Sequence, residues 1–163
     1  MARGRVETLT IESTALRGNP LGDPHVREVP VYLPPGYDAE PKRRYPVVVV
    51  LTGYTGSGAM LLNRAAWNDA LDQRMDRLIA SGACPPMIAV MPDCFTRLGG
   101  SQYLDSTATG KYETHLVREV VPAVDARYRT LADRRHRGVM GKSSGGYGAL
   151  VQAMRHPEVF GAC

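Results

Sequence analysis

Residues 139–150 combine a short apolar run, a glycine-rich turn and a stretch of small and helix-forming residues. The turn is Gly141-Lys142-Ser143-Ser144-Gly145, which matches the G-x-S-x-G pattern of a nucleophile elbow. A serine at the tip of so sharp a turn lies in strained backbone, and the two glycines remove side chains that would collide with strand and helix. The pattern predicts a strand, a turn and a helix, with Ser143 as nucleophile and the Ser144 N–H as a donor to a bound carbonyl oxygen.

Two other interpretations of these residues stay open. Gly141-Lys142-Ser143 also ends a phosphate-binding loop, but that loop requires glycine at position 136, where this chain has His136. A glycine-rich turn without any chemistry is the second alternative, since a short motif needs its structural context. Ser144 is a poor substitute for the nucleophile, because the same pattern would then require glycine in place of Lys142.

The rest of the chain predicts a sheet whose strands alternate with helices. Apolar and β-branched runs predict strands over residues 6–16, 25–33, 45–51 and 86–91, and the start of another over 159–163. Helical periodicity predicts helices over 65–81, 111–128 and 144–155. Pro30 suggests that the second strand lies at an edge or carries a bulge. The order indicates a single α/β domain over residues 1–163 with a mostly parallel sheet and flanking helices.

Two loops are candidates for a binding site. The glycine-rich segment 52–58 follows a buried strand directly, and ligands bind at the carboxyl ends of such strands in α/β sheets. The polar loop 94–110 is long for a compact domain, and loops of this length are usually functional. Within it, Tyr103 and Asp105 are candidates for lining a substrate pocket, with packing or turn formation as the alternative for each.

Single side chains allow three further predictions. Trp67 falls on the apolar side of the predicted helix 65–81 and is expected in the core. His115 lies outside the apolar face of the helix 111–128 and is expected at the solvent side. Cys84, Cys94 and Cys163 lack metal-ligand spacing and are expected to be free thiols, with Cys94 packed in the interior.

Charge and hydropathy argue against several classes of partner. The net charge of +4 comes from 20 basic and 16 acidic residues spread along the chain, without a basic block, so nucleic-acid binding is not expected. No apolar run follows the N-terminus as in a signal peptide, and none approaches membrane-spanning length. We therefore expect a cytoplasmic protein that does not bind membranes.

Five segments together resemble the putative-esterase family of α/β hydrolases, and the resemblance covers nearly the whole chain. The family includes esterase D and S-formylglutathione hydrolases, feruloyl and acetylxylan esterases, enterochelin esterases and mycolyltransferases. The segments are residues 31–37, 50–57, 90–93, 141–149 and 155–161.

The resemblance implies an α/β-hydrolase fold and a serine carboxylesterase that acts on a small ester or thioester without metal or organic cofactor. Ser143 would be the nucleophile, and the N–H groups of Tyr54 and Ser144 would form the oxyanion hole. Gly53 would lie against the substrate. Thr52 stands where many relatives have histidine or aspartate.

The chain departs from the family after the elbow. In α/β hydrolases an acid and then a histidine follow the serine, yet only Glu158 and His156 are available here. A helix of about a dozen residues, rising about 1.5 Å each, would put His156 roughly 18 Å from Ser143, far beyond the roughly 3 Å that a general base needs. We therefore expect the domain to be C-terminally incomplete. Its remaining strands, base and acid would come from a C-terminal polypeptide, and this chain alone would be inactive.

Two alternatives of different kinds remain. A non-catalytic hydrolase-like module would bind a small ester or a partner without turning it over, and an acyltransferase of the same fold would use the same residues. An exposed apolar strand edge would also favour association into homo-oligomers.

Overall fold

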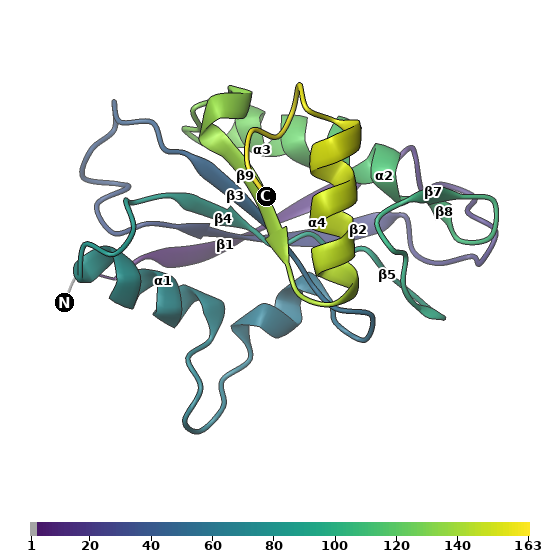
Figure 1. The fold of residues 1–163 in the computed structure, drawn as a ribbon, viewed down its shortest axis with the longest axis horizontal. Helices are drawn as coiled ribbons and strands as arrows, with labels where there is room; N and C mark the ends of the chain where they lie inside the picture. Colours follow the sequence, from purple (N-terminus) through teal and green to yellow (C-terminus); the bar gives the residue numbers. More distant parts are fainter. Residues whose placement is uncertain (1–2) are drawn as a thin grey trace.

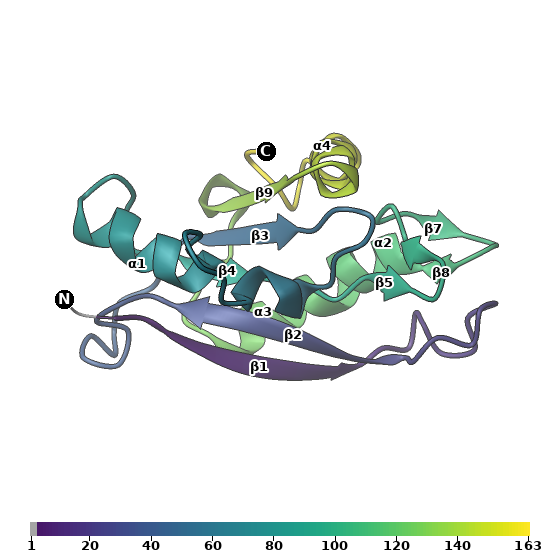
Figure 2. The same ribbon diagram turned by 90° about the horizontal axis from the view of Figure 1, so that it is seen from below.

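A five-stranded mixed sheet forms the centre of the protein in a computed structural model that describes residues 3–163. Its strands are β1 (Arg5–Glu12), β2 (Val26–Leu33), β3 (Val47–Leu51), β4 (Ile88–Val90) and β9 (Arg137–Gly141). They are ordered β1-β2-β4-β3-β9, as Figure 2 shows along the sheet. Strands β4, β3 and β9 run parallel, whereas β2 is antiparallel to both of its neighbours. The predicted α/β class is confirmed.

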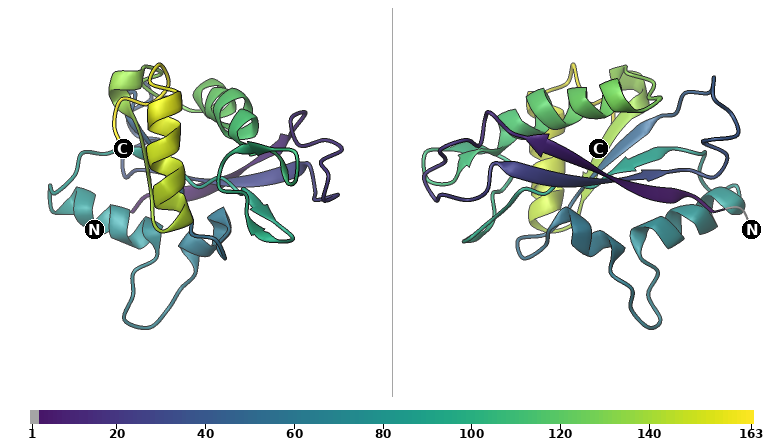
Figure 3. Two further views of the ribbon diagram at one scale, coloured as in Figure 1. Left: turned by 45° about the vertical axis from the view of Figure 1, so that its right-hand side comes forward. Right: turned by 180° about the vertical axis from the view of Figure 1, so that it is seen from behind.

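Helices cover both faces of this sheet (Figures 1 and 3). Alternating residues of β3 divide between two apolar clusters, because successive side chains of a strand point to opposite faces. Val47, Val49 and Leu51 pack with the helical segment 112–127 and with α4 (Ser144–Arg155). Val50 packs on the other face with Met75 of α1 (Leu71–Ala80). The unbroken apolar run of β3 is thus buried on both faces, as expected.

The helical segment after the long loop changes its geometry along its length. It consists of α2 (Tyr112–Thr114), the π-helical segment η2 (His115–Val120) and α3 (Val121–Arg127). Pro122 lies inside this continuous helical segment, because Val120 and Val121 before it are themselves helical. Proline has no N–H to donate to the preceding turn, and the π-helical segment η2 lies directly before α3. Two 3₁₀ turns, η1 (Gly58–Leu62) and η3 (Arg134–His136), lie elsewhere in the chain.

The long polar loop contains two small hairpins. One pairs β5 (Phe95–Thr96) with β6 (Gly99–Gly100), and the other pairs β7 (Asp105–Ser106) with β8 (Gly110–Lys111). Both lie at the end of the molecule where β3 leads into its glycine-rich loop (Figure 2).

The predicted strand over residues 159–163 is not formed as a strand: Val159 lies in a turn, and Ala162 makes an isolated parallel bridge to Gly138 of β9. The Val139 N–H donates to the Ala162 carbonyl at 3.0 Å, and the Gly161 N–H donates to that of Arg137 at 2.9 Å. The expectation for Pro30 was wrong, because β2 is an interior strand. Pro30 lies opposite Thr8 of β1, and its carbonyl still accepts from the Met91 N–H at 2.9 Å.

The prediction for Trp67 was also wrong. The helix begins only at Leu71, and Trp67 is fully exposed in the protruding loop between η1 and α1 (Figure 1). Trp67 has φ 68°, a conformation that α-helical backbone excludes. A bridge between Ala65 and Asn68 closes the loop around it. The helical spacing of apolar residues therefore extended beyond the true helix.

His115 is completely buried, contrary to the prediction of a solvent-side position. Its Nδ1 lies 2.8 Å from Oε2 of Glu119, and Ser13 and Thr14 also donate to that carboxylate. The segment after β1 therefore buries a face of the helical segment that has polar residues and was expected to face solvent. Burial lowers the pKa of His115, although the bond to Glu119 opposes the shift.

The three cysteines are free thiols, as predicted, and Cys94 is buried. Burial, followed by the charge of Asp93, raises the pKa of Cys94 to about 12, so its reactive thiolate is scarce at neutral pH. Between residues 3 and 163, the structure contains no helix of the length and apolarity needed to cross a membrane.

Candidate active site

Ser143 stands at a strained turn between β9 and α4. Its backbone has φ 57° and ψ −123°, a conformation that costs free energy for a residue with a side chain. A Cβ on Gly141 would lie 2.4 Å from the Gly145 carbonyl, and a Cβ on Gly145 would lie 2.2 Å from the Leu51 carbonyl oxygen. Only glycine fits at both positions, so the glycine spacing in the sequence has a steric cause.

The loop after β3 passes directly over the serine. A Cβ on Gly53 would lie 3.6 Å from the Ser143 Cβ and 3.6 Å from the Lys142 carbonyl oxygen. Within residues 3–163, the N–H groups of Tyr54 and Ser144 donate to no backbone or side-chain acceptor. An oxyanion hole requires backbone N–H groups that are free to donate, and both of these groups are free.

Thr52 holds this loop closed. Its hydroxyl donates to the Gly56 carbonyl at 2.7 Å, and its own carbonyl accepts from the Tyr103 hydroxyl at 2.8 Å. The threonine therefore provides the hydrogen bonding of the loop at a position where the resemblance implied histidine or aspartate.

The β5–β6 hairpin holds Tyr54 by both its backbone and its side chain. The Gly100 N–H donates to the Tyr54 carbonyl at 2.6 Å, and the Tyr54 hydroxyl donates to the Leu98 carbonyl at 2.5 Å. Gly99 has φ 110°, and a Cβ there would lie 2.5 Å from the Tyr54 ring. The position of the Tyr54 N–H thus depends on a hairpin that the sequence alone did not reveal.

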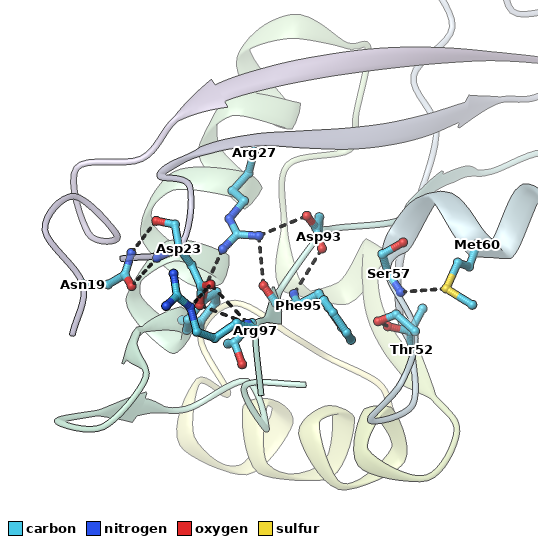
Figure 4. A network of polar contacts seen from close by, with 12 residues as sticks. Asn19, Asp23, Arg27, Thr52, Ser57, Met60, Asp93, Phe95 and Arg97 are labelled. Carbon is cyan, nitrogen blue, oxygen red and sulfur yellow. Dashed lines mark hydrogen bonds and ion pairs between the residues drawn. The ribbon is translucent and has the colours of Figure 1, made fainter. Parts of the chain in front are cut away.

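Arg27 anchors the base of this hairpin from β2 (Figure 4). Its Nη1 donates to Oδ2 of Asp93 at 3.1 Å and to the Phe95 carbonyl at 2.9 Å. Its Nη2 donates to the Tyr112 hydroxyl at 2.7 Å, and its guanidinium stacks over that ring. Arg27 is almost fully buried, and a buried arginine that ties three segments together is costly to remove. No local sequence signal identifies it, because its partners are distant in the chain.

Tyr103 and Asp105, the two predicted pocket residues, lie outside the cleft that contains Ser143. Tyr103 is 3% exposed, and its carbonyl accepts from Nε2 of Gln152 at 2.6 Å. Asp105 accepts from the N–H and the hydroxyl of Thr114, at 2.9 and 2.6 Å. In this chain Tyr103 supports the Thr52 loop, and Asp105 holds the first turn of the following helix. Their contact with a substrate stays a prediction.

A cleft of about 720 Å³ opens beside Ser143. Most of its lining is apolar or uncharged, with two basic residues. It is formed by the end of β3 and its loop, by η1 and α1, and by the elbow. The lining residues are Val50, Leu51, Thr52, Gly53, Tyr54, Thr55, Gly56, Met60, Leu61, Leu71, Arg74, Met140, Gly141, Lys142 and Ser143.

No histidine among the described residues hydrogen bonds to Ser143. Nε2 of His156 lies 2.8 Å from Oε1 of Glu113, at the far end of α4, and His115 pairs with Glu119. His25 approaches only Glu12, at 3.8 Å. The part of the chain that the structure describes also has no cluster of three or more potential metal ligands.

Comparisons with known proteins identify the family of this chain. The family described as "Putative esterase" matches residues 24–163. The chain is 32% identical over 136 residues to an endo-1,4-β-xylanase/feruloyl esterase of Xylanibacter ruminicola, covering 80% of this chain and 18% of that protein.

Solved structures resemble the chain over nearly its full length. A ferulic acid esterase superposes with a TM-score of 0.78 at 30% identity, over 98% of this chain and 58% of its own. An S-formylglutathione hydrolase from Agrobacterium tumefaciens has a TM-score of 0.75 at 20% identity, over 100% of this chain and 57% of its own. This chain therefore spans just over half of these structures and less than a fifth of the curated relative.

Proposed function

Because this chain belongs to the putative-esterase family, we propose that it carries the nucleophile and oxyanion hole of a serine carboxylesterase acting on a small ester or thioester. One observation carries the proposal. Ser143 is held in strained backbone by two sterically required glycines, next to the free N–H groups of Tyr54 and Ser144. A packing or turn residue needs neither the strain nor the unused donors.

The reaction follows from this placement. Oγ of Ser143 attacks the ester carbonyl carbon, and its proton passes to a general base. The carbonyl oxygen becomes negatively charged and accepts hydrogen bonds from the two N–H groups. The C–O bond to the alcohol breaks, the alcohol leaves with the proton, and water then hydrolyses the acyl-serine. Acyl transfer of this type requires no metal or organic cofactor.

We further propose that the general base is a histidine, oriented by a carboxylate, in a polypeptide segment C-terminal to these residues. The histidines within residues 3–163 are engaged elsewhere or lie away from the cleft. Such a segment would pack beside β9, where residues 161–163 already run parallel to it.

Treatment of the native protein with a fluorophosphonate probe, followed by denaturing intact-mass spectrometry, tests both proposals. We expect one adduct on Ser143, its loss in Ser143→Ala, and its retention in the control Ser81→Ala at the exposed end of α1. An adduct that survives Ser143→Ala would refute the nucleophile. The same spectrum reports every polypeptide present. Labelling of a preparation that contains only these 163 residues would refute the proposed source of the base.

A further inference from the structure

Two cations line the cleft beside Ser143, and no acidic residue does. Arg74 lies on α1, on one wall, and Lys142 is the residue just before the serine. An enzyme that only had to accommodate a neutral ester would not require charge at this position. A positive pocket with low-dielectric walls attracts anions.

Neither cation forms an ion pair with any residue from 3 to 163. The carboxylates nearest to Arg74 in sequence are all bound by other groups. Asp69 accepts from Arg77 at 3.0 Å, Asp72 from Arg64 at 2.6 and 2.7 Å, and Asp76 from the Tyr32 hydroxyl and the Gly4 N–H, each at 2.7 Å. Arg74 is thus left without a counter-ion, although it lies among three acids.

Apolar side chains form the rest of the cleft wall. Tyr54, Met60 and Met140 are each about half exposed, and all three line the cleft. Methionine and tyrosine at such positions provide an adaptable apolar surface for a ligand. The cleft therefore combines an apolar wall with two free positive charges.

We propose that the substrate is an ester with an apolar body and a second, negatively charged group such as a carboxylate. Arg74 and Lys142 bind the charge, and Tyr54 and Met60 contact the apolar part. The planar guanidinium of Arg74 suits a carboxylate because it donates two parallel hydrogen bonds. This inference rests on the proposed function, since it concerns the same cleft.

Matched pairs of esters that differ only in this charge test the inference. The first pair is 4-nitrophenyl hydrogen adipate and its methyl ester, with the charge on the acyl side. The second is 3-(butanoyloxy)benzoate and its methyl ester, with the charge on the alcohol side. For at least one pair, we expect the native protein to favour the anion about tenfold in kcat/KM, a preference that shrinks as salt is added.

Calorimetric binding of the same esters to Ser143→Ala separates the two proposals, because it requires no turnover. Tighter binding of the anion without turnover, in a preparation that includes the C-terminal segment, would refute the esterase and support anion recognition. Turnover with equal binding and equal kcat/KM for both members of both pairs would refute anion recognition and leave the esterase standing.

Variants assign the recognition to the two residues. Arg74→Gln and Lys142→Gln should each reduce the anion-to-neutral ratio severalfold, and Arg74→Glu should invert it. Arg77→Gln is the matched control, since Arg77 lies on the same helix but is paired with Asp69 and does not line this cleft. A ratio that is unchanged in both glutamine variants, or reduced equally by Arg77→Gln, would overturn the assignment.

Discussion

Gly145→Ala should destabilise the protein, whereas Gly146→Ala, one residue later in the same helix, should not. A Cβ on Gly145 would lie 2.2 Å from the Leu51 carbonyl oxygen and 2.6 Å from that of Thr52. These are backbone atoms of a buried strand end and cannot rotate away, so we expect an overpacking cost of about 3 kcal/mol. The gain in helix propensity from glycine to alanine offsets about 1 kcal/mol of this cost.

Gly146 provides the control because its Cβ would meet nothing closer than 3.4 Å. Gly146→Ala should therefore change the free energy of unfolding by at most about 1 kcal/mol, in the stabilising direction. Urea unfolding curves, fitted with a common m-value, give the free energy of unfolding of both variants. In addition, Gly145→Ala should slow fluorophosphonate labelling of Ser143, since it displaces the strand end that leads into Gly53. Unfolding free energies that agree within about 0.5 kcal/mol would refute the steric account of the elbow.

Two further predictions concern the support of the site and its acid stability. Gly99→Ala should slow fluorophosphonate labelling of Ser143 by at least about tenfold, because the added Cβ would displace Tyr54. The control is Gly82→Ala, which also has positive φ but no atoms near the added Cβ, and it should leave the labelling rate unchanged. Burial alone would raise the pKa of Glu119, but its hydrogen bonds lower it from 4.5 to about 2. As the pH falls, the Glu119 carboxylate therefore binds a proton at a higher pH in the unfolded state than in the folded state. Between pH 4.5 and 2 the free energy of unfolding should decrease by up to roughly 3 kcal/mol. Urea unfolding at a series of pH values measures this loss. The free energy of unfolding should fall less with decreasing pH in Glu119→Gln than in the exposed control Glu28→Gln, and an equal fall in both variants would contradict the prediction.

Local signals in the sequence were sufficient to predict the turn at Ser143 and the strands of the sheet. The glycine on each side of Ser143 recurs at a fixed spacing, and this local pattern predicts the turn, although the contact that excludes a side chain at Gly145 is with the end of β3. The apolar run of β3 is unbroken because both faces of this strand are covered. Such features depend on neighbours in the chain or on burial, and both leave a pattern in the sequence.

Tertiary contacts decided the rest, because the groups involved are far apart in the chain. The helical spacing around Trp67 predicted burial, yet a loop with positive φ exposes it. The polar position of His115 predicted solvent, yet the segment after β1 covers it. Arg27 binds Asp93 and Phe95, which are 66 and 68 residues away. The sequence by itself predicted the turn at Ser143 with the strand before it and the helix after it, and the folded structure determined which distant side chains hold the loop after β3 in place.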